Sequence, residues 1–282
     1  MDLSSLWLIA RLFVIGLLPL AVVSVCIFIM RNLFISMFLM HWIGMAIPVL
    51  LYVSLCEGRA GIRWYMKYIS IQQLLKHSVS ALILFVTGAG VIVSGYILMS
   101  CRFAVWDACI GQVDENIAEY GFHDAPLGLI ICCAIYFPVV NPLIEEVFWR
   151  VFMLKELSKL RGYDTTESSA EQGHLLQTQP DMNLQALDIT EVEKWDVSWP
   201  MRIYASVLYA SYHTLVVGLF LGGVLYGALS FFCITLLGLI FVCIFLFSRQ
   251  DEGFYRAVFL HAGIDTGVVI AVGDAIGWYN LV

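Results

Sequence analysis

Residues 127–154 read LGLIICCAIYFPVVNPLIEEVFWRVFML, an apolar run that carries two adjacent glutamates, Glu145 and Glu146, and one arginine, Arg150. A helix needs about 20 apolar residues to cross a bilayer, so the run is long enough for a membrane span. Charged side chains inside a span are costly, and they usually face the interior of the protein or a water-filled cavity. We therefore predict a transmembrane helix that carries a polar site.

The composition of the whole chain indicates a membrane protein. Hydrophobic residues make up 61 % and charged residues 13 % of the 282 residues, whereas a soluble domain carries about 25 % charged residues. We predict an all-α fold, a polytopic membrane bundle of about seven to eight transmembrane helices. The seven predicted spans are residues 6–30, 33–55, 79–101, 127–153, 202–222, 224–247 and 255–275.

Two prolines lie inside the fourth predicted span. Pro138 and Pro142 predict a kink or a break there, and a break would raise the number of spans to eight. Asn141 is a typical N-cap residue, and Pro142 is well suited to the first position of a helix. A new helix that begins at Pro142 would place Glu145 and Glu146 just past its first turn.

The charged residues outside the spans predict the orientation of the chain. Residues 162–200 hold eight acidic side chains and one lysine, which accounts for the formal net charge of −7. Lysine and arginine gather in residues 59–76, 155–161 and 249–256, and loops rich in these residues are usually cytoplasmic. We expect a cytoplasmic N-terminus, an outer C-terminus and a cytoplasmic acidic loop that is a candidate surface for a protein partner. No basic tract indicates nucleic-acid binding.

Polar residues recur in the spans at a spacing of four. The three pairs are Glu146 with Arg150, Tyr209 with His213, and His261 with Asp265. Residues four apart share one face of a helix, and the first pair has the favoured order for an ion pair. Counted along their helices, Glu145 and both histidines lie at a similar depth on the cytoplasmic side. We expect them to share a pocket.

Taken in chain order, these motifs resemble those of the CAAX-prenyl-protease and bacteriocin-processing family, abbreviated CPBP and also called ABI. The family pattern is E-E-x-x-x-R, then an aromatic residue-x-x-x-H, then H-x-x-x-N/D. The resemblance covers about residues 127–275, so we expect N-terminal transmembrane helices at 1–126 and a core at 127–282 that the acidic loop 162–200 interrupts. Tyr209 stands where phenylalanine is usual, and Asp265 where asparagine is common.

The resemblance implies an intramembrane endopeptidase. Glu145 would be the general base that acts on water, and His213 would position and polarise that water. Asp265 would orient His261 or hold it protonated, so that His261 stabilises the oxyanion. The supporting residues would be Glu146, Arg150 and Tyr209.

The sequence leaves the metal open. Glu145, His213, His261 and Asp265 could hold zinc. The zincin motif H-E-x-x-H is absent from the chain, and we favour a metal-free glutamate mechanism.

The expected substrate is a membrane protein or peptide that enters from the bilayer or the cytoplasm. The short loops and compact chain indicate a bacterial cell inner membrane. Two other functional classes are considered. Intramembrane Glu, His and Asp also build proton relays, which would suit a proton-coupled transporter, although no inverted repeat is visible. A catalytically silent scaffold would use the acidic loop to bind a partner.

The remaining polar and glycine-rich positions are interpreted as structural. Arg11 is close enough to the N-terminus to reach the interface. The glycine pairs Gly88–Gly90 and Gly222–Gly223 would permit close helix packing. Four histidines show no partner pattern: His41, His77, His123 and His174.

Overall fold

The computed structural model describes residues 3–69, 71–102, 125–160, 195–220, 224–248 and 250–275. These residues form helices and no strand, which confirms the predicted all-α fold. The acidic segment lies outside them up to residue 194, and so does Gly222–Gly223. In chain order the elements are α1 (Leu3–Phe28), α2 (Leu33–Leu39), η1 (Met40–Ala46), α3 (Ile47–Cys56), α4 (Gly58–Tyr68), α5 (Ile71–Lys76), α6 (Ser78–Arg102), α8 (Leu127–Glu146), η2 (Val147–Met153), α10 (Trp199–Phe220), α11 (Val224–Phe247) and α12 (Gln250–Ala275).

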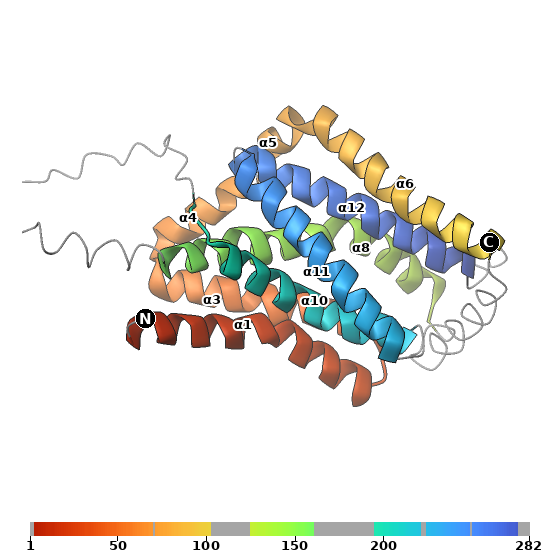
Figure 1. Cartoon of the computed structure of the whole chain (residues 1–282), viewed down its shortest axis with the longest axis horizontal. Coiled ribbons are helices and arrows are strands. Elements are labelled where there is room, and N and C mark those ends of the chain that lie inside the picture. The colour runs from red at the N-terminus through yellow and green to blue at the C-terminus, as the bar shows by residue number, and fades with distance from the viewer. Residues whose placement is uncertain are drawn as a thin grey trace, which may run out of the picture.

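The helices form one bundle with α8 at its centre (Figure 1). α8 packs against α12 and η1, α12 packs along α6, and α10 packs along α11. α1 begins at one end of the bundle near α4, whereas α12 ends at the opposite end beside the end of α6 (Figure 1).

Among the described residues, six helical segments are long and apolar enough to cross a membrane. They are Ser5–Phe28, Leu33–Cys56, Ala81–Leu98, Leu127–Leu160, Val224–Phe247 and Glu252–Asp274. All six coincide with predicted spans, and the chain is an integral membrane protein. The seventh predicted span is the helix α10, which is not among the six. Polar residues such as Arg202 and His213 lower its hydropathy, and its residues Tyr209 and Tyr212 are buried against other helices.

The predicted break in the fourth span is wrong. α8 runs through Pro138 and Pro142, and with η2 it forms one helical segment from Leu127 to Leu160. Asn141 is therefore not an N-cap. It lies inside the helix with 1 % of its surface exposed. A proline removes one backbone hydrogen bond, and membrane helices tolerate this loss when neighbouring groups satisfy the freed carbonyl.

Two π-helices of seven residues interrupt the second and fourth spans. At the end of η1, the N–H of Ile47 donates a hydrogen bond to the carbonyl of Trp42, five residues back, as in a π-helix. Such wider turns are rare, and they often occur at functional sites. η1 carries His41 and η2 carries Arg150, so each wider turn redirects a polar side chain relative to a regular α-helix.

Polar contacts join the first helices to the segment that follows η2. Lys155 Nζ lies 2.7 Å from Glu57 Oε1. The Tyr52 hydroxyl donates to Glu156 Oε2 over 2.6 Å, and Glu156 is fully buried. The N-terminal helices are therefore bonded to the segment that carries the glutamate pair.

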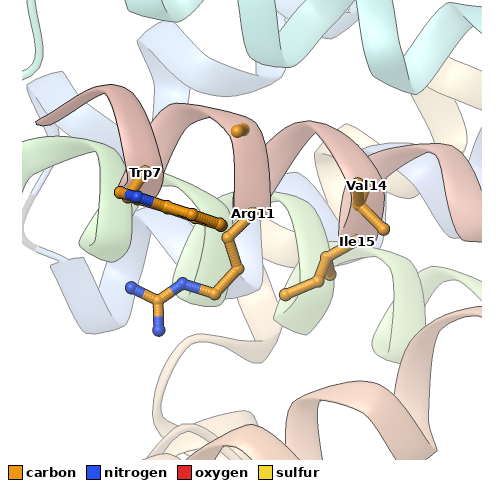
Figure 2. A pocket seen from close by; sticks show the side chains of 5 residues that line it. Trp7, Arg11, Val14 and Ile15 are labelled. Carbon is orange, nitrogen blue, oxygen red and sulfur yellow. The ribbon is translucent and has the colours of Figure 1, made fainter. Parts of the chain in front are cut away.

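The outer surface of the bundle is apolar, as lipid contact requires. Large side chains such as Leu55 and Val224 are exposed there. Figure 2 shows a groove along α1, where Trp7 and Arg11 lie beside aliphatic side chains. The Arg11 guanidinium carbon lies 5.6 Å from the centroid of the Tyr52 ring, so the aromatic face supports this cation near the end of the bundle.

Glycine permits close contact between α6 and α12. A Cβ built on Gly263 would lie 2.1 Å from the carbonyl oxygen of Phe85, and one on Gly88 would lie 2.6 Å from that of Leu260. Side chains do not tolerate such distances to backbone atoms. A Cβ on Gly90 would meet nothing within 4 Å. The predicted packing role therefore holds for Gly88 and is wrong for Gly90.

We expect Gly263→Ala to lower the free energy of unfolding by about 1–3 kcal/mol, because the added methyl group forces α6 away from α12. Gly90→Ala is the matched control, because it adds the same group to α6 in open space, and it should change stability by less than about 0.5 kcal/mol. Thermal unfolding of both variants in the same detergent measures the difference. Equal midpoints would show that the two helices do not pack as described.

Candidate active site

Four helical elements bring one carboxylate and three imidazoles together in the middle of the bundle. Glu145 lies near the end of α8, His41 in η1, His213 in α10 and His261 in α12. At about 1.5 Å per residue, Glu145 lies about 22 Å along the helix from Leu160. Glu145, His41 and His261 are at most 2 % exposed. His213 retains 24 % exposure of its side chain and is the accessible member of the group.

The two oxygens of Glu145 have different surroundings. Oε1 accepts a hydrogen bond from His41 Nε2 over 3.3 Å. Oε2 faces His213 Nε2 at 3.9 Å and His261 Nε2 at 3.7 Å, and it accepts no hydrogen bond from the described residues. These distances exceed direct hydrogen bonds and suit groups that a water molecule bridges. Oε2 is therefore the oxygen available for chemistry.

Glu146 holds two partners at once. Its Oε2 lies 3.1 Å from Arg150 Nε, so the predicted ion pair is present. Its Oε1 accepts a hydrogen bond from His261 Nδ1 over 3.0 Å. A carboxylate on Nδ1 fixes the ring and directs Nε2 at the site. Arg150 also makes cation–π contacts with two rings, with its guanidinium carbon 4.6 Å from the Tyr209 centroid and 5.0 Å from that of Phe241.

His213 is oriented by its own helix. Its Nδ1 lies 3.0 Å from the backbone carbonyl of Tyr209, four residues back. A carbonyl can only accept, so Nδ1 carries the hydrogen and Nε2 of the neutral ring is an acceptor. Tyr209 also places its ring 4.7 Å from the imidazole centroid. Tyr209 thus orients the His213 ring in two ways, through its backbone carbonyl and through the contact between the two rings.

Asp265 has a different partner from the one expected. Its Oδ2 accepts a hydrogen bond from Asn141 Nδ2 over 2.7 Å, whereas His261 Nε2 is 3.7 Å away. Glu146 makes the shorter contact with His261, and the expectation that Asp265 orients His261 or holds it protonated stays a prediction. All four residues are buried.

Two residues of the site were not predicted, His41 and Asn141. Asn141 lies four residues before Glu145, so helical spacing placed it on the same face, but the proline that follows it favoured a helix start. His41 and Glu145 lie 104 residues apart. No local pattern could have paired them.

The candidate metal ligands do not form a metal site in this arrangement. Within the part of the chain that the structure describes, no three His, Cys, Asp or Glu side chains are placed to hold a metal ion. His213 and His261 face Glu145 Oε2 at 3.9 and 3.7 Å, and Asp265 Oδ2 lies 3.7 Å from His261 Nε2. To hold zinc, the four side chains that the sequence predicted as candidate ligands, Glu145, His213, His261 and Asp265, would have to move from these positions.

The sequence model of one protein family matches residues 127–267, and its description is "Rce1-like: Type II CAAX prenyl endopeptidase Rce1-like". The match covers half of the chain and includes Glu145, His213, His261 and Asp265, whereas His41 lies outside it. No curated protein and no solved structure matches the chain.

Proposed function

The chain belongs to the Rce1-like family of type II CAAX prenyl endopeptidases, and from this membership we propose that it is an intramembrane endopeptidase that cleaves a membrane-associated protein or peptide. Membership of this family supports the class of reaction, which is peptide-bond hydrolysis by an integral membrane protein. The observation that carries the mechanism is the position of Glu145 Oε2, which is buried and faces the Nε2 atoms of two imidazoles at 3.7 and 3.9 Å.

In the proposed reaction, Glu145 is the general base. A water molecule between Oε2, His213 and His261 donates one proton to Oε2 as its oxygen attacks the carbonyl carbon. His213 Nε2 accepts a hydrogen bond from the other O–H of the water, which stays on the attacking oxygen, and thereby fixes the direction of the water. Glu145 then passes the proton to the leaving amine as the C–N bond breaks, which yields a carboxylic acid and an amine.

The developing oxyanion needs a donor. A protonated His261 donates from Nδ1 to Glu146 and presents Nε2–H to the site. Asp265 cannot donate when ionised. We propose that it holds the Asn141 amide instead, whose second N–H is then available to the oxyanion. Asn141 would thereby supply the amide donor that an asparagine at position 265 would provide directly.

The substrate approaches from the side of His213 in this proposal, because His213 is the site residue with an exposed surface. We propose that the site faces the cytoplasm, from the distribution of Lys and Arg in the loops. We propose a bacterial inner membrane from the short loops and the compact chain. The acidic segment 162–200 remains a candidate surface for a protein partner.

The experiment that tests the function compares wild type with Glu145→Gln in the native host. Protein and peptide termini of the membrane fraction are profiled by mass spectrometry. Termini that appear only with wild type would establish a protease and identify its substrate. Identical profiles from two folded proteins would contradict the proposal, and proton flux in sealed vesicles would then support a transporter.

We propose a metal-free reaction, so chelation should leave the activity unchanged. Purified enzyme is dialysed against EDTA and 1,10-phenanthroline, and cleavage of the substrate found in the host is measured before and after. The expected change is less than about twofold, because the base is a carboxylate of the chain. Loss of activity that added zinc restores would assign the base to a metal-bound water held by Glu145, His213, His261 and Asp265.

A further inference from the structure

His41 is a buried titratable group at the site that the proposed mechanism does not use. It is fully buried, and its Nε2 donates to Glu145 Oε1 over 3.3 Å. It lies in the second span, outside residues 127–267 that match the family. A buried imidazole in a membrane span is costly unless it has a partner and a role.

We propose that His41 is a positioning residue for Glu145. By holding Oε1, it turns the carboxylate so that Oε2 faces His213 and His261. The inference rests on the proposed function, in which Oε2 receives the proton from water. The N-terminal helices would then complete the active site of the core.

The backbone around His41 is built to place its side chain. The π-helix η1 begins one residue before it and widens the turn on which it stands. Gly44, in the same π-helix, packs against α1 so closely that a Cβ would lie 3.0 Å from the Pro19 Cα. The Tyr136 ring of α8 lies 5.7 Å from the imidazole centroid. Contacts on both sides therefore fix the ring relative to α8.

The energetic reason follows from burial. Both Glu145 oxygens are inside the protein, and a buried carboxylate oxygen without a donor costs free energy. With the donor at Oε1, one orientation of the carboxylate is preferred, and Oε2 remains directed at the proposed water, between His213 and His261. Without it, the carboxylate can rotate toward His213 or His261 and occupy that position itself. Misplacement of a reacting group by about 1 Å can cost about 100-fold in rate.

The test compares two substitutions of His41. His41→Phe keeps an aromatic ring and removes the donor. His41→Gln keeps an N–H donor at nearly the position of Nε2. We expect His41→Phe to lower kcat about 100-fold with KM changed less than about threefold, and His41→Gln to retain activity within about tenfold.

Two further measurements separate positioning from a structural role. In the Glu145→Gln background, His41→Phe should cause no additional loss of activity, because it acts through Glu145. The thermal midpoint of His41→Phe should fall below that of His41→Gln, because His41→Phe leaves Glu145 Oε1 without a donor, and both variants should be folded at the assay temperature. Wild-type activity in His41→Phe, or equal losses in both variants together with a lowered midpoint, would overturn the proposal.

An infrared readout makes the test independent of the proposed function. The carboxylate band of Glu145 is isolated as the difference between the wild-type and Glu145→Gln spectra. It should shift in His41→Phe and remain in place in His41→Gln. If the wild-type enzyme cleaves nothing, the proposed function fails, and the band still decides whether His41 holds Glu145. An unshifted band in His41→Phe would overturn the positioning role.

Discussion

Glu145→Gln is expected to abolish peptide-bond hydrolysis while the chain remains folded. Glutamine has the shape of glutamate, and its oxygen can still accept from His41 Nε2. The amide cannot take a proton from water, and the loss of a general base lowers kcat by about 10⁴-fold. Single-turnover cleavage of the natural substrate in nanodiscs measures the effect. Glu145→Asp should retain part of the activity, because it keeps the base at the end of a shorter side chain.

Glu252→Gln is the matched control for this change. Glu252 pairs with Arg256 near the start of α12, about 13 Å along that helix from His261. The substitution removes one carboxylate from the same bundle and should leave kcat within about twofold. If Glu145→Gln cleaves at the rate of the Glu252 variant, the base is another group and the mechanism is wrong.

Helical spacing predicted the parts of the site that are local in the chain. The ion pair of Glu146 and Arg150 and the contact of Tyr209 with His213 need only a helix of regular pitch. Composition and apolar runs were sufficient for the all-helical membrane fold, because a bilayer leaves few alternatives. The motif order was sufficient for the family.

The contacts between helices could not be predicted in the same way. Spacing alone could not pair Glu146 with His261, because 115 residues separate them. The role assigned to Asp265 depended on the helix that faces it, and that helix carries Asn141. The prolines of α8 predicted a kink or a break because the local cost of a proline is known, whereas the packing of neighbouring helices that compensates for this cost is not visible in a sequence.

The second large effect concerns Arg150, which we expect to be essential for stability. Arg150 is 1 % exposed, and it is the cation paired with the buried carboxylate of Glu146. Arg150→Met keeps the apolar stem and removes the cation from Glu146 Oε2, so that His261 on Oε1 is the partner that remains, and this costs about 3–5 kcal/mol. Arg150→Lys keeps a charge but loses the guanidinium that contacts the Tyr209 and Phe241 rings, so it should lose less stability than Arg150→Met without reaching wild type. Unfolding of the variants in one detergent, followed by tryptophan fluorescence, measures the difference.

The double variant Glu146→Gln/Arg150→Met separates loss of the charge pair from loss of packing. If the cost of Arg150→Met is the loss of the cation beside the carboxylate, neutralising Glu146 should recover about half of the lost stability. The glutamine oxygen can still accept from His261 Nδ1, so the ring keeps its direction and some activity should return with the fold. A double variant as unstable as Arg150→Met alone would assign the loss to the contacts of Arg150 with Tyr209 and Phe241. In that case Arg150 would stabilise the bundle through its packing against the Tyr209 and Phe241 rings, and the role of Glu146 would be the hydrogen bond to His261 alone.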